Sequence, residues 1–529
     1  MKVSKISLFL LLMIFSSSVF AQTTNKSFIF QNTKGQEFIF NEIQLNSFIL
    51  KDKIKKNKKI AKMQALKGKK NSAKISKFAL DDFFVSNSAF YEESCSSGDL
   101  SNYFMIDGKS ELVIKGYDVL GSKDIAAEWL GIPSSGDMDD IDAQRTAGGH
   151  KFSSKISMAP EMKRWGVNYF VQKKLRDNFW FSILVPFVNV ATNARLSEYE
   201  ISGARPETLM PLLEDDSRGV LFFEEPLNVT QALSHPLMKY GKIDNKKHQK
   251  AGLADITLRL GLNKMYKKCL LDLYTQLVVP TGDKPTAEYL FEPIVGNGHH
   301  FAAGAGAKFS AKYKNFTLMS DFDYLYLFQS SEKRSFDLNN GPWSRYMAAT
   351  TGLPRTRPQR LINYLTKDLY VTPGSYANAL FAADFNRDKI HLQFGVNIEA
   401  KASEKVYLKE GFNDYVGIAF YDTHAPQSMI VDTYDTYNRT YSKADINDDM
   451  IVAIASADSS FTNIKESDLN LDSARSLNQL SVNPFVSVGF DGTLDSHPYN
   501  VSFGTFYKSN SNNKSIGSWG LWLNASISI

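Results

Sequence analysis

Long hydrophobic runs are almost absent from this chain of 529 residues. Beyond the first 21 residues no stretch of about 18 consecutive apolar residues occurs, which excludes a bundle of membrane-spanning helices. Cysteine is equally scarce, because Cys95 and Cys269 are the only two and lie far apart. They form neither a disulfide framework nor a metal site, although one bridge between them stays open. A soluble exported protein and a barrel of membrane-crossing strands are the classes left.

Signals for bound groups and for catalysis are also missing. The sequence has no phosphate-binding glycine loop and no zinc-ligand spacing, so we expect no cofactor and no metal. Two acidic clusters, 137–142 and 445–449, offer oxygen ligands for Ca²⁺ but lack the spacing of a defined motif, which favours solvated surface loops. His299 and His300 have no compact serine-containing element beside them. We therefore expect that the protein is not an enzyme, and an outer-membrane lipid hydrolase is the least favoured alternative.

The first 21 residues have the three-part layout of a secretory signal. Lys2 and Lys5 precede an apolar run that is too short to span a membrane, and small residues end at Ala21. No cysteine follows at the cleavage position, which argues against a lipid anchor. We predict export and cleavage before Gln22.

Positive charge is concentrated just after this signal. Between Lys51 and Lys77 there are 12 lysines and one acidic residue, Asp52. Without these residues and the two lysines of the signal, 47 basic and 55 acidic side chains remain, so the rest of the chain is mildly acidic. The segment has too few apolar residues for a core. We predict that residues 22–100 form a short irregular or helical basic leader in the periplasm, either a solvated tail or an arm that contacts anionic partners. Nucleic-acid binding is not expected of an exported chain.

Alternation of apolar and polar side chains repeats along the remainder of the chain. A period of two is strand geometry, and in Ile390–Ala400 every even-numbered residue is apolar. The pattern predicts an all-β fold of about 12 antiparallel strands whose first strand lies near 151–158, with Glu111–Leu120 as the competing first strand. The other expected strands lie near 163–174, 178–190, 254–263, 271–279, 301–313, 315–328, 377–386, 390–400, 480–490, 497–507 and 515–529.

The connections between these segments alternate in length. Short polar turns follow the even-numbered strands, and long loops at about 191–250, 281–298, 329–376 and 402–479 follow odd-numbered ones. Short turns on one rim and long loops on the other are typical of transmembrane barrels in the bacterial outer membrane. We therefore assign residues 101–529 to an outer-membrane β-barrel with long external loops. Its lipid-facing wall would contact outer-membrane lipid, and its last strand, which ends at Ile529, resembles the strand that barrel-assembly machinery recognises.

Charged side chains on the polar face of the expected strands are candidates for the barrel lumen. In a wet interior they would pair across strands and bias which solutes pass, or they would merely fill a narrow lumen. These candidates are Asp255, Arg259, Asp272, Lys308, Lys312, Asp321, Asp323, Asp384, Lys389, His391, Glu399 and Lys401.

One short stretch resembles a known family. Leu277–Lys284 followed by Gly296–Phe301 looks like the strand-PTGD-loop-GxG-strand element of the barrels associated with meta-pathway phenol degradation. The resemblance covers about 25 residues and implies a barrel fold and, for substrate, small hydrophobic or aromatic solutes. We predict an outer-membrane channel or passive transporter for small solutes. The alternatives are a surface structural or adhesive barrel whose loops bind a partner, and a soluble exported β-protein. The sequence leaves the oligomeric state open.

Overall fold

The computed structural model describes thirteen segments of the chain. They are residues 83–95, 105–116, 124–132, 152–175, 178–203, 226–266, 269–339, 341–351, 359–420, 439–441, 462–494, 497–510 and 517–529. The expected signal, most of the expected leader and both acidic clusters lie outside these segments. No helix among the described residues is long and apolar enough to cross a membrane.

Twelve antiparallel strands close into a β-barrel, as the alternation predicts. Each strand pairs with its neighbour in the chain, and the first pairs with the last, so no barrel edge is left open. The barrel strands are β1 (Phe83–Cys95), β5 (Glu161–Lys174), β6 (Phe179–Asn193), β9 (Ile256–Tyr266), β10 (Cys269–Val279), β11 (Ala302–Tyr313), β12 (Phe316–Leu327), β18 (Gly374–Arg387), β19 (Ile390–Lys401), β24 (Gln479–Leu494), β25 (His497–Asn510) and β26 (Gly517–Ser528).

The position of the first strand corrects the sequence analysis. β1 lies inside the range assigned to the leader and pairs with β26 on one side and β5 on the other, so the barrel begins at Phe83 and not at residue 101. Residues 153–158, expected as the first barrel strand, form β4 (Ser153–Met158) in a separate sheet. The two errors have different causes. Strands of any half-buried sheet alternate between apolar and polar side chains, so β4 resembled a barrel strand. The alternation of β1 is weak because aromatic side chains lie on its inner face.

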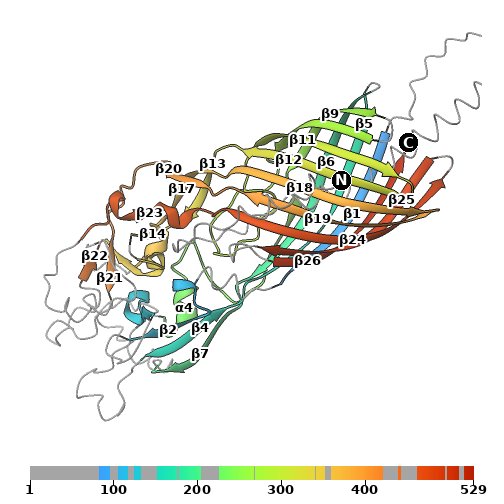
Figure 1. Ribbon diagram of the computed structural model, residues 1–529. Coiled ribbons are helices and arrows are strands. Elements are labelled where there is room, and N and C mark those ends of the chain that lie inside the picture. Colours follow the sequence, from blue (N-terminus) through green and yellow to red (C-terminus); the bar gives the residue numbers. More distant parts are fainter. Residues whose placement is uncertain are drawn as a thin grey trace, which may run out of the picture.

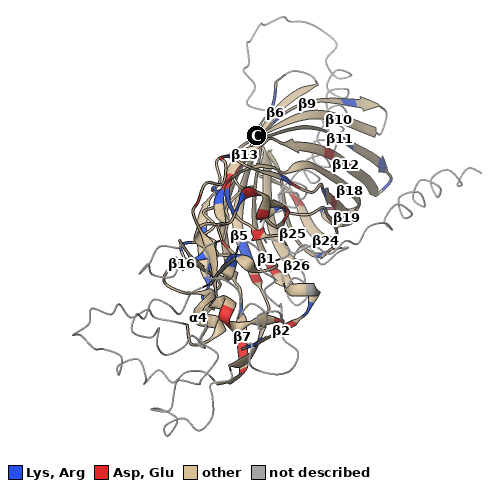
Figure 2. Ribbon diagram, turned by 90° about the vertical axis from the view of Figure 1, so that its left-hand side faces the viewer, with Lys and Arg blue, Asp and Glu red and all other residues tan. Residues whose placement is uncertain are grey.

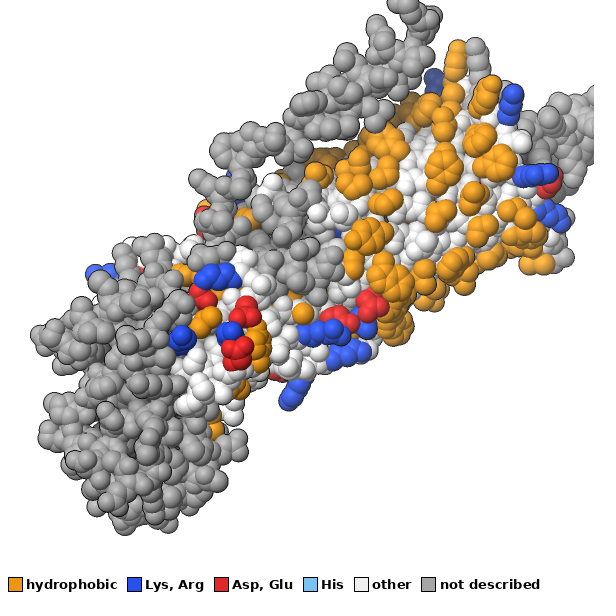
Figure 3. Space-filling view, turned by 60° about the horizontal axis from the view of Figure 1, so that its bottom comes forward, with side chains coloured by type: hydrophobic (Ala, Val, Ile, Leu, Met, Phe, Trp, Pro, Cys, Tyr) orange, Lys and Arg blue, Asp and Glu red, His pale blue; other side chains and the backbone are white. Residues whose placement is uncertain are grey.

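Burial in the barrel is the reverse of that in a soluble protein. Outward side chains are large, apolar and exposed, such as Leu273 at 47%, Phe394 at 51% and Leu523 at 52%, whereas most inward ones are polar and buried. Figure 3 shows the apolar side chains as a broad band across the visible face of the barrel wall, with charged side chains on either side of it. Tyr91 and Trp519 pack together on β1 and β26 with ring centroids 5.8 Å apart. This arrangement is typical of barrels that cross a membrane.

The five long connections between barrel strands fold together at one end of the barrel, opposite the C-terminus (Figure 1). We call this part the loop domain: the described residues of 96–160, 194–255, 280–301, 328–373 and 402–478. Four of these connections match the expected long loops, and 96–160 is a fifth that the sequence analysis missed.

The elements of the loop domain are short strands and single helical turns. Its sheets have the orders β3-β2-β4-β7, β13-β17-β20, β16-β15-β21-β22 and β14-β23, and β8 extends the barrel wall beside β6. The bounds are β2 (Glu111–Lys115), β3 (Ile125–Ala126), β7 (Leu196–Ser202), α4 (Val229–Leu233), β8 (His248–Leu253), β13 (Ser330–Ser335), β14 (Asp337–Leu338), β15 (Ala348–Thr350), β16 (Gln359–Arg360), β17 (Thr366–Thr372), β20 (Lys405–Leu408), β21 (Gly417–Phe420), β22 (Arg439–Tyr441), β23 (Leu469–Asn470), η1 (Ile106–Gly108), η2 (Ala127–Leu130), η4 (Ser344–Tyr346), η5 (Leu361–Asn363), η8 (Glu466–Asp468) and η9 (Leu471–Ala474).

The loop domain has a hydrophobic core of its own. Residues from all five connections contribute to it, among them Leu112, Phe291, Phe336, Val416 and Ile464, each at most 3% exposed. The external loops are therefore a packed cap on the barrel and not a set of independent solvated segments.

Candidate functional site

Several of the expected lumen residues lie buried along the inner wall of β9 to β12. The Nε of Arg259 donates to Gln276 at 3.1 Å, and Trp180 Nε1 donates to Asp272 at 2.8 Å. Lys308 and Asp321 occupy directly paired positions on β11 and β12, with Nζ and Oδ2 3.9 Å apart. These groups form a polar inner wall.

The other candidates occupy different surroundings. Asp384 and His391 contact each other at 3.2 Å near the short β18–β19 turn. Lys312 and Asp323 are half-buried on β11 and β12. Lys389 is exposed in the β18–β19 turn, where it lies over the Phe490 ring, so it is not part of the inner wall.

Two buried ion pairs cross between strands on the other side of the lumen. Arg164 on β5 binds Glu92 on β1, and both side chains are 2% exposed. Lys508 on β25 binds Glu399 on β19 at 3.0 Å, with both side chains 3% exposed. Acidic and basic segments accordingly lie side by side around β1, β5 and β25 in Figure 2. Of these four residues the sequence analysis named Glu399 alone, because β1 was not recognised and β5 and β25 alternate weakly.

An aromatic cluster lies inside the barrel on β24 to β26, among the strands that carry these ion pairs. Phe485, Phe506 and Trp522, on β24 to β26, are each at most 7% exposed and pack together with Phe90. Each ring lies over a glycine of the neighbouring strand; Trp522, for instance, covers Gly504. The inner glycines therefore make room for rings that would otherwise project into the lumen. The sequence analysis considered only charged side chains as lumen candidates, so it did not identify these aromatic residues.

The lumen is thus a filled interior. Of the two readings that the sequence left open, an open pore and a lumen filled by its own side chains, the structure supports the second for the described residues, since most inward side chains are under 9% exposed. Passage of a solute requires these groups to move.

The connection between β10 and β11, residues 280–301, folds back onto the strands β6 and β9 at the loop-domain end of the barrel. Asp283 N donates to Val295 O at 2.6 Å, which brings the two halves of the 280–301 connection together, and Val295 is fully buried against Val188 on β6. Asp255 accepts hydrogen bonds from the backbone N–H of Gly282 at 3.0 Å and of Asn297 at 2.8 Å. Asp255 is therefore an anchor for this connection, which we call the plug loop.

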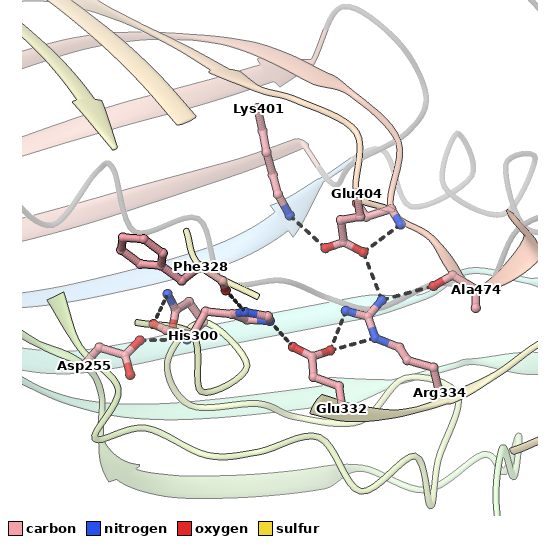
Figure 4. A network of polar contacts seen from close by, with 10 residues as sticks. Asp255, His300, Phe328, Glu332, Arg334, Lys401, Glu404 and Ala474 are labelled. Carbon is pink, nitrogen blue, oxygen red and sulfur yellow. Dashed lines mark hydrogen bonds and ion pairs between the residues drawn. The ribbon is translucent and has the colours of Figure 1, made fainter. Parts of the chain in front are cut away.

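A chain of buried charges continues from the plug loop into the loop domain (Figure 4). His300 Nε2 lies 2.5 Å from Glu332 on β13, and Arg334 bridges Glu332 at 2.5 Å and Glu404 at 3.1 Å. Lys401, at the end of β19, lies 3.4 Å from Glu404. We call these five residues the mouth network. It joins the plug loop to the connections that follow β12 and β19.

The charges in the mouth network are mutually dependent. Burial raises the pKa of Glu404, but Arg334 and Lys401 outweigh it and hold the pKa at about 2. Burial likewise raises the pKa of Glu332, and Arg334 and His300 outweigh it and lower that pKa. His300 Nδ1 lies 2.8 Å from the carbonyl oxygen of Phe328, and Nε2 lies 2.5 Å from Glu332 Oε1, so both ring nitrogens are engaged.

The geometry of the histidines also bears on the hydrolase alternative. Both nitrogens of His300 are engaged, and the ring is 0% exposed, so it has no free nitrogen to accept a serine proton. His299 Nδ1 lies 3.2 Å from the carbonyl of Gly282. Among the described residues no group of three or more His, Cys, Asp or Glu side chains is placed to hold a metal ion, and Cys95 and Cys269 are both free.

Comparison with known proteins adds little beyond this geometry. No protein-family model matches the sequence, and no curated protein does either. An outer-membrane channel from Pseudomonas putida F1 aligns over 86% of this chain and 100% of its own, with 9% identity and a TM-score of 0.36. A Pseudomonas aeruginosa FadL homologue (8% identity, TM-score 0.27, 84% of this chain and 90% of that one) and the Ralstonia pickettii toluene transporter TbuX (8%, 0.26, 84% and 88%) align less well. At these values the likeness carries no argument, and the barrel rests on the strand pairing described above.

Proposed function

We propose that this protein is an outer-membrane channel for small solutes of hydrophobic or aromatic character, closed in this state by its plug loop. The observation that carries the proposal is the aromatic cluster inside a barrel whose lumen is otherwise polar. Apolar rings in a lumen can contact an apolar solute and so remove its surface from water. The resemblance of the plug loop to the phenol-pathway barrels points the same way. In this proposal the protein is a transporter and not an enzyme.

The proposal extends to the location of the protein. The apolar belt would contact outer-membrane lipid, β26 would present the terminal strand to the assembly machinery, and residues 1–21 would be removed on export. The basic segment before β1 would lie on the periplasmic side, where β1 begins and β26 ends.

The test separates the closed channel from a barrel that never conducts. Purified full chain and Asp255→Ala are inserted into planar bilayers and single-channel currents are recorded. Asp255→Ala removes the hydrogen bonds that Gly282 and Asn297 donate to the carboxylate just before β9, and leaves the contacts of Thr281 with Ala254 and Ile256 in place. We expect steady ion conduction from the variant and little from the native chain. Glu292→Ala is the matched control, because Glu292 also accepts backbone hydrogen bonds in the plug loop, from Thr286 and Ala287, but does not tie the loop to the barrel.

A second function has one observation in its favour. The loop domain has a folded core, which exceeds what is needed to narrow a pore, and a surface structural or adhesive barrel would use it to bind a partner. If Asp255→Ala inserts yet conducts no ions and takes up no solute, this second function replaces the channel.

A further inference from the structure

Three asparagines on neighbouring strands face the lumen next to Glu399. Asn378 lies on β18, Asn397 on β19 and Asn483 on β24, and all three are at most 4% exposed. Asn378 is the direct cross-strand partner of Glu399, and Asn397 is that of Asn483. We call these three residues the amide cluster.

Glu399 orients two of the three amides. Its Oε1 accepts from Asn397 Nδ2 at 3.0 Å and from Asn483 Nδ2 at 2.8 Å. Because Oε1 accepts both hydrogen bonds, the NH₂ group of each amide faces Glu399. The carbonyl oxygens of Asn397 and Asn483 are therefore held away from Glu399, and neither has a hydrogen-bond partner among the described residues.

Asn378 is the most exceptional member. Both its Oδ1 and its Nδ2 are buried and make no hydrogen bond within the described part of the chain. The hydroxyl of Tyr376, two residues earlier on the same face of β18, is in the same condition. Leaving such a group unpaired costs about 1–3 kcal/mol, so several of them side by side point to a ligand that pairs with them.

The cluster borders an apolar surface. Phe485 follows Asn483 on the inner face of β24, and Leu380 follows Asn378 on that of β18. Leu380 is buried in one hydrophobic cluster with the aromatic side chains Phe485 and Trp522. The charge of Glu399 is already balanced by Lys508. The site therefore offers three amide carbonyls, one amide NH₂ group and one hydroxyl beside an apolar surface. Asp323 on β12, the other cross-strand partner of Asn378, borders the site and accepts from Gln276 Nε2 at 3.0 Å.

We propose that the amide cluster binds a small neutral solute that carries hydroxyl or N–H groups on one edge and an apolar face on the other. Acceptors outnumber donors in the site, so the solute must donate hydrogen bonds, and the apolar surface takes its carbon face. This rests on the proposed channel function and narrows its substrate class. A site built around hydrogen bonds discriminates strongly against analogues that lack them.

The experiment uses four soluble ring compounds of similar size: cyclohexane-1,3-diol, cyclohexanone, cyclohexanecarboxylate and cyclohexylammonium. Binding to the full chain in deuterated detergent is measured by saturation-transfer NMR and titration. We expect the diol to bind at least tenfold more tightly than the ketone and the two ions. Equal binding of all four compounds, or no binding of the diol, would overturn the proposal, the latter showing that water alone occupies the site.

Asn378→Leu is the decisive variant. Asn378 has no internal hydrogen bond to lose, so the substitution should leave the thermal midpoint unchanged or raise it, while the affinity for the diol falls about tenfold. Asn168→Leu is the control: Asn168 is 1% exposed on β5, six strands around the ring from β18. If Asn378→Leu binds the diol as tightly as the native chain, the amide cluster is not the site.

Failure of this site is distinguishable from failure of the channel. Swelling of proteoliposomes is followed with the same four compounds against empty liposomes. Swelling with no preference among compounds rejects the amide cluster and keeps the channel, whereas no swelling with the native chain or with Asp255→Ala rejects the channel itself.

Discussion

Arg334 links the loop domain to the end of the barrel. Its replacement by leucine should destabilise the loop domain around β13 and β20 and leave the barrel strands unaffected. Arg334→Leu leaves Glu332 and Glu404, both 0% exposed, without the cation that balances them. Removing one partner of a buried ion pair costs about 3–5 kcal/mol. His300 and Lys401 remain within reach of one carboxylate each, so we expect the lower end of that range.

Hydrogen–deuterium exchange in detergent measures this cost locally. A loss of about 3 kcal/mol raises the exchange rate of protected amides in β13 and β20 by about two powers of ten. Amides of β24 and β25, deep in the barrel ladder, should exchange as in the native chain. Lys155→Met is the control, since its ion pair with Glu200 lies at the surface and contributes little to stability. Unchanged protection of β13 and β20 in Arg334→Leu would refute the role given to the mouth network.

Three further outcomes follow from the same structure. Acid should weaken the loop domain progressively below about pH 4.5. The folded pKa of Glu404, about 2, lies below its ordinary value of 4.5, so about 3 kcal/mol of stability is present above pH 4.5 and is lost as pH falls toward 2. Hydrogen exchange measured along a pH series checks this. Gly504→Ala should lower the yield of refolded barrel on a heat-shift gel, because its Cβ would lie 2.1 Å from the Trp522 ring, and a normal yield would contradict that packing. Leu523→Arg, midway along β26, should destabilise the inserted barrel by about 2–4 kcal/mol in urea titration, while Tyr313→Arg beside a turn should cost about 1 kcal/mol or less; equal costs would argue against a membrane-buried belt.

The strand pattern was readable from the sequence wherever one face of a strand meets lipid and the other meets polar lumen. In Ile390–Ala400 both conditions hold, and β19 lies where the alternation placed it. In β1 they do not, because Asn87 faces outward and is exposed while Phe90 belongs to the inner aromatic cluster. The period of two is blurred there by the side chains that fill the lumen.

The site was less predictable than the fold. Asp272, Lys308 and Asp321 could be identified as inward residues because they lie on strands with clear alternation. Three residues of the mouth network, Glu332, Arg334 and Glu404, lie in long connections. Their contacts form only in the folded loop domain, so no local sequence pattern identifies them. Asn378 was missed for a different reason, since a neutral amide does not stand out in a search for lumen charge.

The seam between β1 and β26 joins the two most distant parts of the barrel sequence, with Phe84 paired to Ser528. The ring therefore cannot close until the last residues of the chain have been delivered, and loss of the final strand would expose hydrogen-bonding edges on β1 and β25 at once. Because the cap is assembled from connections spread around that ring, a chain interrupted before β26 lacks both a sealed wall and a stable platform for the cap. Chains that lack β26 should therefore associate with one another through these open strand edges.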